Sequence, residues 1–80
     1  MKFLVEVMPR AEALDPQGRT ILHSLKSLGF GAVADCRVGK AIVLTVDSSD
    51  QREALKGVEK MAEKLLFNPL IETYRVRVLE

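Results

Sequence analysis

The sequence has little of what catalytic and metal sites are usually made from. Its 80 residues include one cysteine, one histidine and no tryptophan. A single cysteine excludes an internal disulfide, and a single histidine leaves no ligand set at the spacing of a zinc site. Neither charge is in clear excess, because 12 lysines and arginines face 11 aspartates and glutamates. This near-neutral balance provides no basic field for nucleic acid or an anionic membrane, so neither partner is expected. With no ligand set in the sequence, no metal is expected either.

Long hydrophobic runs are also missing. No apolar segment approaches the ~20 residues needed to cross a membrane. The strand-like stretch KFLVEVM begins so early that no signal peptide is expected ahead of it, and a cytoplasmic protein is the expectation. Apolar residues make up 48% of the chain and charged residues 29%, which is typical of a folded protein. At this length the sequence predicts one domain over residues 1–80.

The first half of the chain predicts a strand followed by a helix. Apolar residues alternate through KFLVEVM, the period of a strand, and Pro9 ends it. Asp15 is a suitable N-cap and Pro16 a suitable first helical residue. Gly29 is placed where a left-handed residue ends a helix. One stripe of this helix carries the apolar residues Ile21, Leu22, Leu25 and Leu28.

The second half predicts a hairpin, a helix and a last strand. The stretch AVADCRVGKAIVLTV suggests two strands joined by a tight turn at Gly39–Lys40, where glycine would supply a positive φ. Asp50 and Glu53 form a capping-box pattern at the start of a second helix. Asn68–Pro69 closes that helix, and LIETYRVRVLE alternates as a strand. The apolar face expected on the second helix consists of Leu55, Val58, Ala62 and Leu65.

This order of elements predicts an α+β, ferredoxin-like βαββαβ fold. Right-handed crossovers would give a four-stranded antiparallel sheet with both helices on one face. The other face would be uncovered, yet the first and third strands are apolar on both faces. An exposed apolar patch usually marks an interface, so we expect copies of the chain to associate there. Leu4, Met8 and Val43 are the candidate residues for this homo-oligomer interface.

Gly18 lies on the leucine stripe of the first helix, within the motif LDPQG. A glycine inside a helix costs about 1 kcal/mol relative to alanine, so close approach of another backbone is the expected compensation. Alternatively, the free amides of this first turn hold an anion or a partner's carboxylate.

Candidate chemistry elsewhere is sparse, and no catalytic or cofactor-binding residue is expected. His23 points away from the leucine stripe and is interpreted as a surface residue. Cys36 has no histidine or helix N-terminus nearby to lower its pKa, so a buried, inert thiol is expected. Asp35, Arg37 and Lys40 could recognise a partner, or the first two could form a structural ion pair.

Three stretches carry a family resemblance: LDPQG before the first helix, VADCRVGKAIVLTV, and EKMAEKLLFNPLIETYRV into the last strand. Their patterns DPQG, D-x-R-x-G-K and E-K-L-L-x-N-P-x-I-E-x-Y occur in the order and spacing of the PurS family. Together they cover nearly the whole chain, which therefore resembles the small subunit of phosphoribosylformylglycinamidine (FGAM) synthase. Cys36 stands where the family pattern is variable.

The resemblance implies a subunit of an enzyme of purine biosynthesis. That enzyme converts formylglycinamide ribonucleotide, ATP and glutamine into FGAM, ADP, phosphate and glutamate. A glutaminase subunit (PurQ) frees ammonia, and a large synthetase subunit (PurL) uses ATP and Mg²⁺. The small subunit would hold the two together as a homodimer or a tetramer, with no cofactor of its own. Asp15, Gln17 and Gly18 are then expected to shape a surface that docks the synthetase.

Two other functions occur on domains of this topology. Dimeric ferredoxin-like domains often bind small effectors between subunits, so a ligand-sensing regulatory module is the alternative. An RNA-binding domain of similar topology needs aromatic residues on exposed strands and a basic excess, and both are scarce here. Co-purification separates an adaptor, which retains a synthetase and a glutaminase, from a sensor.

Overall fold

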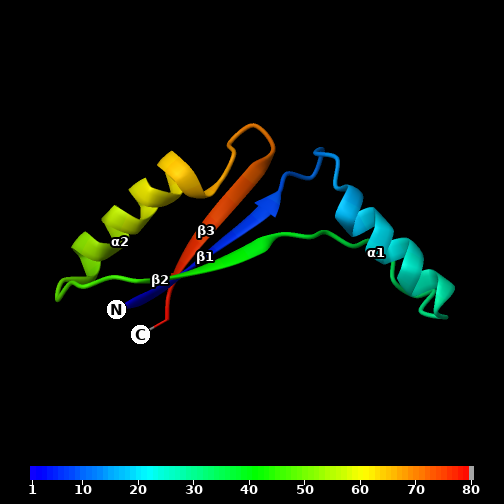
Figure 1. The fold of residues 1–80 in the computed structure, drawn as a ribbon, viewed down its shortest axis with the longest axis horizontal. Helices are drawn as coiled ribbons and strands as arrows, with labels where there is room; N and C mark the ends of the chain where they lie inside the picture. The colour runs from blue at the N-terminus through cyan, green and yellow to red at the C-terminus, as the bar shows by residue number, and fades with distance from the viewer. Residues whose placement is uncertain (80) are drawn as a thin grey trace.

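The computed structural model describes residues 1–79 and has an α+β architecture. In chain order its elements are β1 (Lys2–Pro9), α1 (Pro16–Ser27), β2 (Lys40–Thr45), α2 (Gln51–Met61), a π-helical turn η1 (Ala62–Leu66) and β3 (Glu72–Val78). These strands form a three-stranded sheet of order β2-β1-β3 with both pairings antiparallel. Figure 1 shows α2 lying along one side of this sheet and α1 projecting beyond its end.

The core lies between α2 and the sheet. The alternating residues Phe3, Val5 and Val7 of the central strand are fully buried, because α2 covers the face toward which they point. From α2 and η1, three small or branched residues complete this buried set: Ala54, Val58 and Ala62. The Asp50 side chain caps α2 by accepting hydrogen bonds from the amides of Arg52 and Glu53, the first half of the predicted capping box. The reciprocal half is not formed, because the Asp50 amide donates to Ser48 Oγ and not to Glu53.

One expected core residue of the second helix, Leu65, is 82% exposed, so that prediction is wrong. The helix does not continue with α-helical periodicity but widens into η1. The wider turn changes which side chain meets the sheet. Leu66 packs against the core in place of Leu65.

The four-stranded, ferredoxin-like sheet was also predicted wrongly. Residues 33–39 are extended but pair with no strand within the described chain, so no hairpin forms at Gly39–Lys40. Gly39 does not have a positive φ; Gly29 does, at 102°, as expected at the end of α1. A Cβ at Gly39 would collide with the Val7 carbonyl oxygen and the Met8 sulfur. Gly39 therefore lets the chain pass close to the end of β1 rather than turn back on itself.

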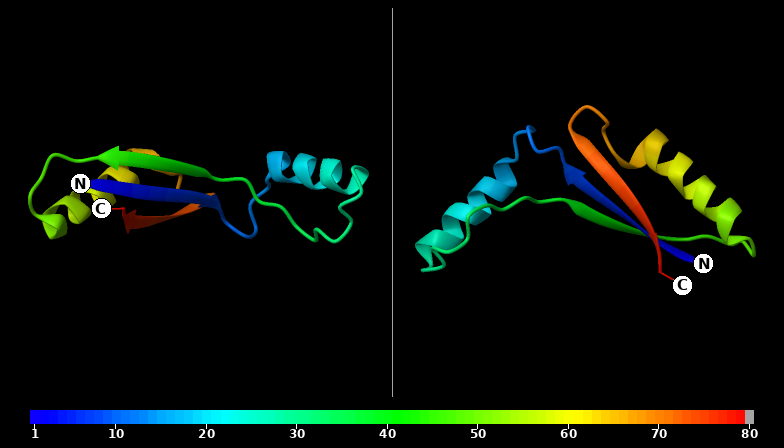
Figure 2. Two further views of the ribbon diagram at one scale, coloured as in Figure 1. Left: turned by 90° about the horizontal axis from the view of Figure 1, so that it is seen from below. Right: turned by 180° about the vertical axis from the view of Figure 1, so that it is seen from behind.

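The expectation of two helices on one face fails as well, because α1 does not pack on this chain's sheet. It stands apart from the sheet in all three views (Figures 1 and 2). Gly18 is its only buried residue. We call residues 16–35, which comprise α1 and the chain that runs back along it, the arm. Residues 10–15 and 36–39, which join the arm to the sheet, are the neck.

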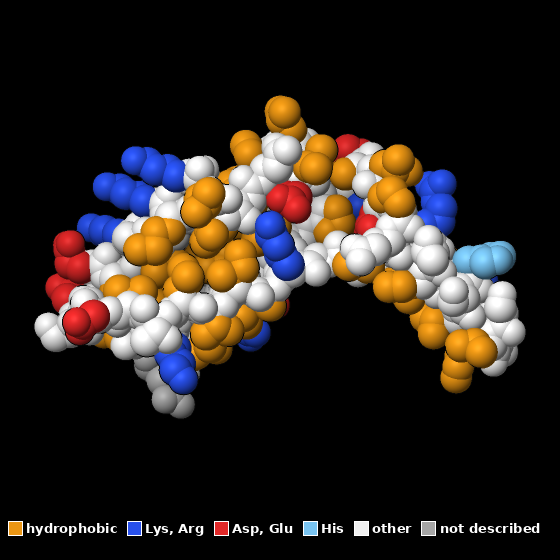
Figure 3. All heavy atoms as spheres, in the orientation of Figure 1, with side chains coloured by type: hydrophobic (Ala, Val, Ile, Leu, Met, Phe, Trp, Pro, Cys, Tyr) orange, Lys and Arg blue, Asp and Glu red, His pale blue; other side chains and the backbone are white. Residues whose placement is uncertain are grey.

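The arm makes the molecule long and thin. Its principal extents are 49 × 26 × 13 Å and its radius of gyration is 16.0 Å. A compact chain of this length has a radius of gyration of about 12 Å. The leucine stripe predicted for α1 is present, but Leu28 is 73% exposed and Ile21 is also exposed. Figure 3 shows hydrophobic side chains gathered along the concave underside of the arm.

Candidate functional site

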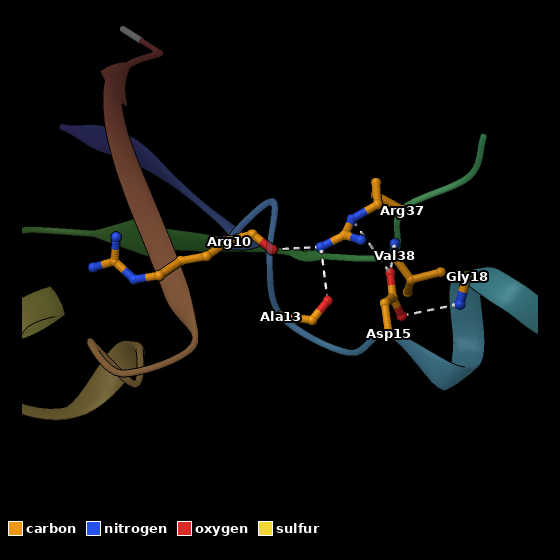
Figure 4. A network of polar contacts seen from close by, with 6 residues as sticks. All are labelled: Arg10, Ala13, Asp15, Gly18, Arg37 and Val38. Carbon is orange, nitrogen blue, oxygen red and sulfur yellow. Dashed lines mark hydrogen bonds and ion pairs between the residues drawn. The ribbon is translucent and has the colours of Figure 1, made fainter. Parts of the chain in front are cut away.

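The neck is held together by the carboxylate of Asp15. Its Oδ1 accepts a hydrogen bond from the Gly18 amide at 3.0 Å, which caps α1 as the sequence predicts. Its Oδ2 accepts a second bond, at 2.8 Å, from the amide of Val38 on the returning chain. One side chain thus joins the start of α1 to the segment that leads into β2 (Figure 4).

Arg37, on the returning segment, adds further links to residues 10–15. Its Nη2 donates to the backbone carbonyls of Arg10 and, at 3.3 Å, Ala13, and its Nε lies 4.0 Å from Asp15 Oδ2 (Figure 4). The structural ion pair considered for Arg37 therefore exists, but its partner is Asp15 and not Asp35.

Gly18 has the packing role predicted for it. A Cβ at this position would collide with the Cys36 carbonyl oxygen and would lie 2.6 Å from Asp15 Oδ2. The glycine therefore lets the helix start approach another backbone, as the stripe position implies. The carboxylate that its amide meets belongs to Asp15, so an external anion would have to displace it.

The environment of Asp15 favours its charged form. Hydrogen bonds from the Gly18 amide and then the Val38 amide lower the pKa of this carboxyl below its ordinary value of 3.8, and the charge of Arg37 acts in the same direction. Desolvation opposes the shift, since the Asp15 side chain is only 10% exposed. At neutral pH the neck is held by a carboxylate.

The predicted docking residues fall into two groups. Asp15, Gly18 and Arg37 are brought together, but their polar groups are engaged within the neck. Gln17, Asp35 and Lys40 are exposed. A surface hollow connects the neck and the arm, and its lining includes Asp35, Arg19 and Leu22.

The two lone reactive side chains differ from each other in placement. His23 is exposed, as predicted. Cys36 is only half-buried, so the buried thiol expected from the sequence is not found. Within residues 1–79 no group of three or more histidine, cysteine or acidic side chains could hold a metal ion. Nor do these residues include a helix with the length and hydropathy to span a membrane.

The sheet face opposite α2, which we call the open face, carries Leu4, Met8 and Val43, as predicted. Val43 lies directly across from Leu4 in the register and is 57% exposed. Beside this apolar strip, Arg77 Nε lies 3.2 Å and Arg75 Nη2 3.9 Å from Glu6 Oε1.

This charged cluster was not identified from the sequence. Its signal was present, however, because Arg75 and Arg77 alternate with core residues in the last strand and so share the uncovered side. What the alternation could not reveal is that both guanidinium groups converge on one carboxylate of the neighbouring strand.

Comparison with known proteins identifies the family. Residues 2–80 match the model of PurS, phosphoribosylformylglycinamidine (FGAM) synthase. The phosphoribosylformylglycinamidine synthase subunit PurS of Bacillus subtilis is 43% identical over 79 residues, which cover 99% of this chain and 93% of the relative. A solved structure of B. subtilis PurS superposes with a TM-score of 0.83 at 42% identity, covering 99% of this chain and 98% of that one.

A chain of the solved PurLQS structure from Thermotoga maritima is also similar. It has a TM-score of 0.87 at 38% identity, with 95% of this chain and 93% of that chain covered. The similarity includes the arm and the neck, because the coverage extends over nearly the whole length. The chain belongs to the PurS family of FGAM synthase subunits.

Proposed function

We propose that this chain is the adaptor subunit of an FGAM synthase and associates with a synthetase subunit, PurL, and a glutaminase subunit, PurQ. The observation that carries the proposal is family membership over the full length, together with a relative whose solved structure is PurLQS. The geometry supports it, since the polar groups of the neck are engaged in holding the chain together while two apolar surfaces are uncovered.

In this role the subunit performs no bond-making step. The glutaminase frees ammonia from glutamine, and the synthetase uses ATP and Mg²⁺ to activate the amide oxygen of formylglycinamide ribonucleotide for attack. Ammonia in transit must be kept from water and protons, and an adaptor that fixes the two sites relative to each other serves that need. The setting of this pathway is the cytoplasm.

Self-association is part of the proposal, because one copy leaves too much surface uncovered. Its accessible area is 5980 Å², whereas a compact protein of 8.9 kDa exposes about 4,800 Å². The excess, about 1,200 Å², is of the order that one partner buries in a stable interface. A dimer is the smallest assembly that covers it, and a tetramer would cover more.

The arm is the surface that most needs a second copy. An isolated helix of 12 residues is marginal in water, and α1 contributes no side chain to the core of its own chain. Covering the stripe of Ile21, Leu25 and Leu28 would bury apolar area and hold the helix in place. The arm therefore replaces Leu4, Met8 and Val43 as the contact between copies that we propose.

Docking of the synthetase near the neck is assigned to the exposed candidates. Gln17 lies next to Gly18 but is not needed for the cap, which Asp15 provides. Asp35 and Lys40 are exposed at the ends of the returning neck segment. Asp15, Gly18 and Arg37 then contribute to docking only by fixing the conformation of the neck. Gln17→Ala should weaken assembly without lowering the melting temperature.

Co-purification tests the proposal. The tagged chain, expressed in its own organism, should retain both the synthetase and the glutaminase in the presence of glutamine and ATP. Retention of neither, with a small effector or a different regulated enzyme in their place, would contradict the adaptor role and support the sensing module.

A further inference from the structure

We infer that the open face is the docking surface for a partner subunit with an acidic, partly apolar patch, and not for a second copy of this chain. The inference rests on the proposed function, which supplies partners other than a second copy. It assigns to this face a chemistry of recognition, carried by Arg75 and Arg77 beside the apolar strip formed by Leu4, Met8 and Val43.

The charge of the open face differs from that of the rest of the chain. Strand alternation places three cations on this face, Lys2, Arg75 and Arg77, and a single anion, Glu6. The face is therefore net positive by two, while the whole chain is net positive by only one. The rest of the molecule is slightly negative, so the positive charge is concentrated where the sheet is uncovered.

The two arginines have binding capacity to spare. Their side chains are 78% and 56% exposed and share one carboxylate, and Glu6 Oε1 is shielded from water without a well-aligned hydrogen bond among the described residues. A guanidinium group presents five donors, so this pair has more donors than the one carboxylate can accept. A carboxylate brought by a partner would meet them in the bidentate geometry that arginine favours.

The apolar strip and a hollow complete the surface. Half-buried Leu4 lies across from exposed Val43, and exposed Met8 follows beyond Glu6 on the same strand. Beside Met8 a hollow is lined by Glu6, Thr73, Tyr74 and Arg75. An apolar centre with arginine at its border is the usual composition of a protein interface. The hollow is open to receive a side chain that brings a carboxylate to Arg75.

Charge complementarity decides between the two possible occupants. Stacking the open faces of two copies would oppose two surfaces that are each net positive by two, which disfavours that pairing. A second copy has the arm to cover instead. A patch that offers acidic groups around an apolar centre is attracted by the same charges, so the partner is a different subunit.

The test uses the full chain with the purified synthetase and glutaminase subunits from the same organism. The Arg75→Gln/Arg77→Gln variant is compared with Arg52→Gln/Lys56→Gln, a matched loss of two exposed charges on α2. We expect Kd for assembly to rise about tenfold or more in the first variant and to change less than about twofold in the second. Raising the salt concentration should weaken the wild type more than the first variant.

Two further measurements complete the design. Glu6→Gln should bind equally well or more tightly, because it frees both guanidinium groups for the partner. Sedimentation should show the same self-association for wild type and the Arg75→Gln/Arg77→Gln variant, and melting curves should show that both are folded.

Three results would overturn the inference. Equal Kd for the two double variants shows that the arginines do not contact a partner. Loss of self-association, with unchanged affinity per assembled copy, shows that a second copy occupies the face. If the wild type binds neither subunit, the proposed function fails together with this inference, whereas failure of the variants alone to differ leaves the proposed function in place.

Discussion

Gly18 and Asp15 show how single residues shape the route of this chain. The sequence placed Gly18 on the inward stripe of α1, and the structure brings the Cys36 carbonyl against it. The need for a glycine could be predicted because helix periodicity is local. The identity of the neighbouring backbone could not, because residues 36–38 return to the helix start from about 20 positions away in the sequence.

The first prediction concerns the Gly18 contact. Gly18→Ala should lower the free energy of unfolding by about 1–3 kcal/mol, since the new methyl group meets backbone that cannot move without disturbing the neck. Gly57→Ala is the matched control, because a Cβ there meets open space within α2. It should leave stability unchanged or raise it by up to about 1 kcal/mol. Denaturant unfolding at one protein concentration measures both, and equal effects would contradict the account.

The second prediction is a pH dependence from Asp15. Its folded-state pKa is lowered, so its contribution to stability is fully present above the ordinary value of 3.8. That contribution is lost as the pH falls through 3.8 and then through the lower folded-state pKa. Asp15→Asn should therefore be less stable than wild type at neutral pH, and the two should converge in acid.

Unfolding curves recorded from neutral to strongly acid pH check this, at fixed protein concentration because self-association adds to stability. Asp35→Asn, which removes an exposed carboxylate, serves as control. Its difference in stability from wild type should be the same at neutral and at acid pH. A constant gap between wild type and Asp15→Asn at all pH values would refute a role for the Asp15 charge.

At the scale of elements, local patterns were reliable and pairing was not. The helix caps at Asp15 and Asp50, the left-handed Gly29 and the alternating strands all depend on near neighbours in sequence, and all were predicted. The hairpin was not found, because the extended residues before Gly39 return from α1 to the sheet instead of pairing with β2. An apolar stripe indicates that one face of a helix must be covered. It does not indicate whether the same chain or another one covers it.

The third prediction concerns α1. Leu25→Glu should shift the protein to a monomer, since it places a charge in the stripe that we propose a second copy covers. The sheet and α2 should remain folded, because none of the buried core residues comes from α1. His23→Glu introduces the same side chain at an exposed position of the same helix and should leave self-association intact. Sedimentation velocity separates the two, and an unaltered dimer in Leu25→Glu would exclude the arm as the interface.

At the scale of the whole molecule, a four-stranded domain was predicted, but the chain is extended and forms three strands. The sequence contains the apolar residues for a larger core, but one copy buries only part of them. The position of Leu4, Met8 and Val43 on the open face was predicted from alternation alone. The arm could not be predicted, because the sequence does not show that α1 fails to pack against the sheet of its own chain.

In the proposed role, the chain couples glutamine hydrolysis to FGAM synthesis without performing chemistry itself. The most direct measurement is FGAM formation by purified synthetase and glutaminase, with and without this chain, using either glutamine or ammonium as nitrogen donor. We predict that glutamine-dependent turnover requires the chain, that ammonium-dependent turnover of the synthetase does not, and that Cys36→Ser restores glutamine-dependent turnover as well as wild type. Equal glutamine-dependent rates with and without the chain would contradict the account.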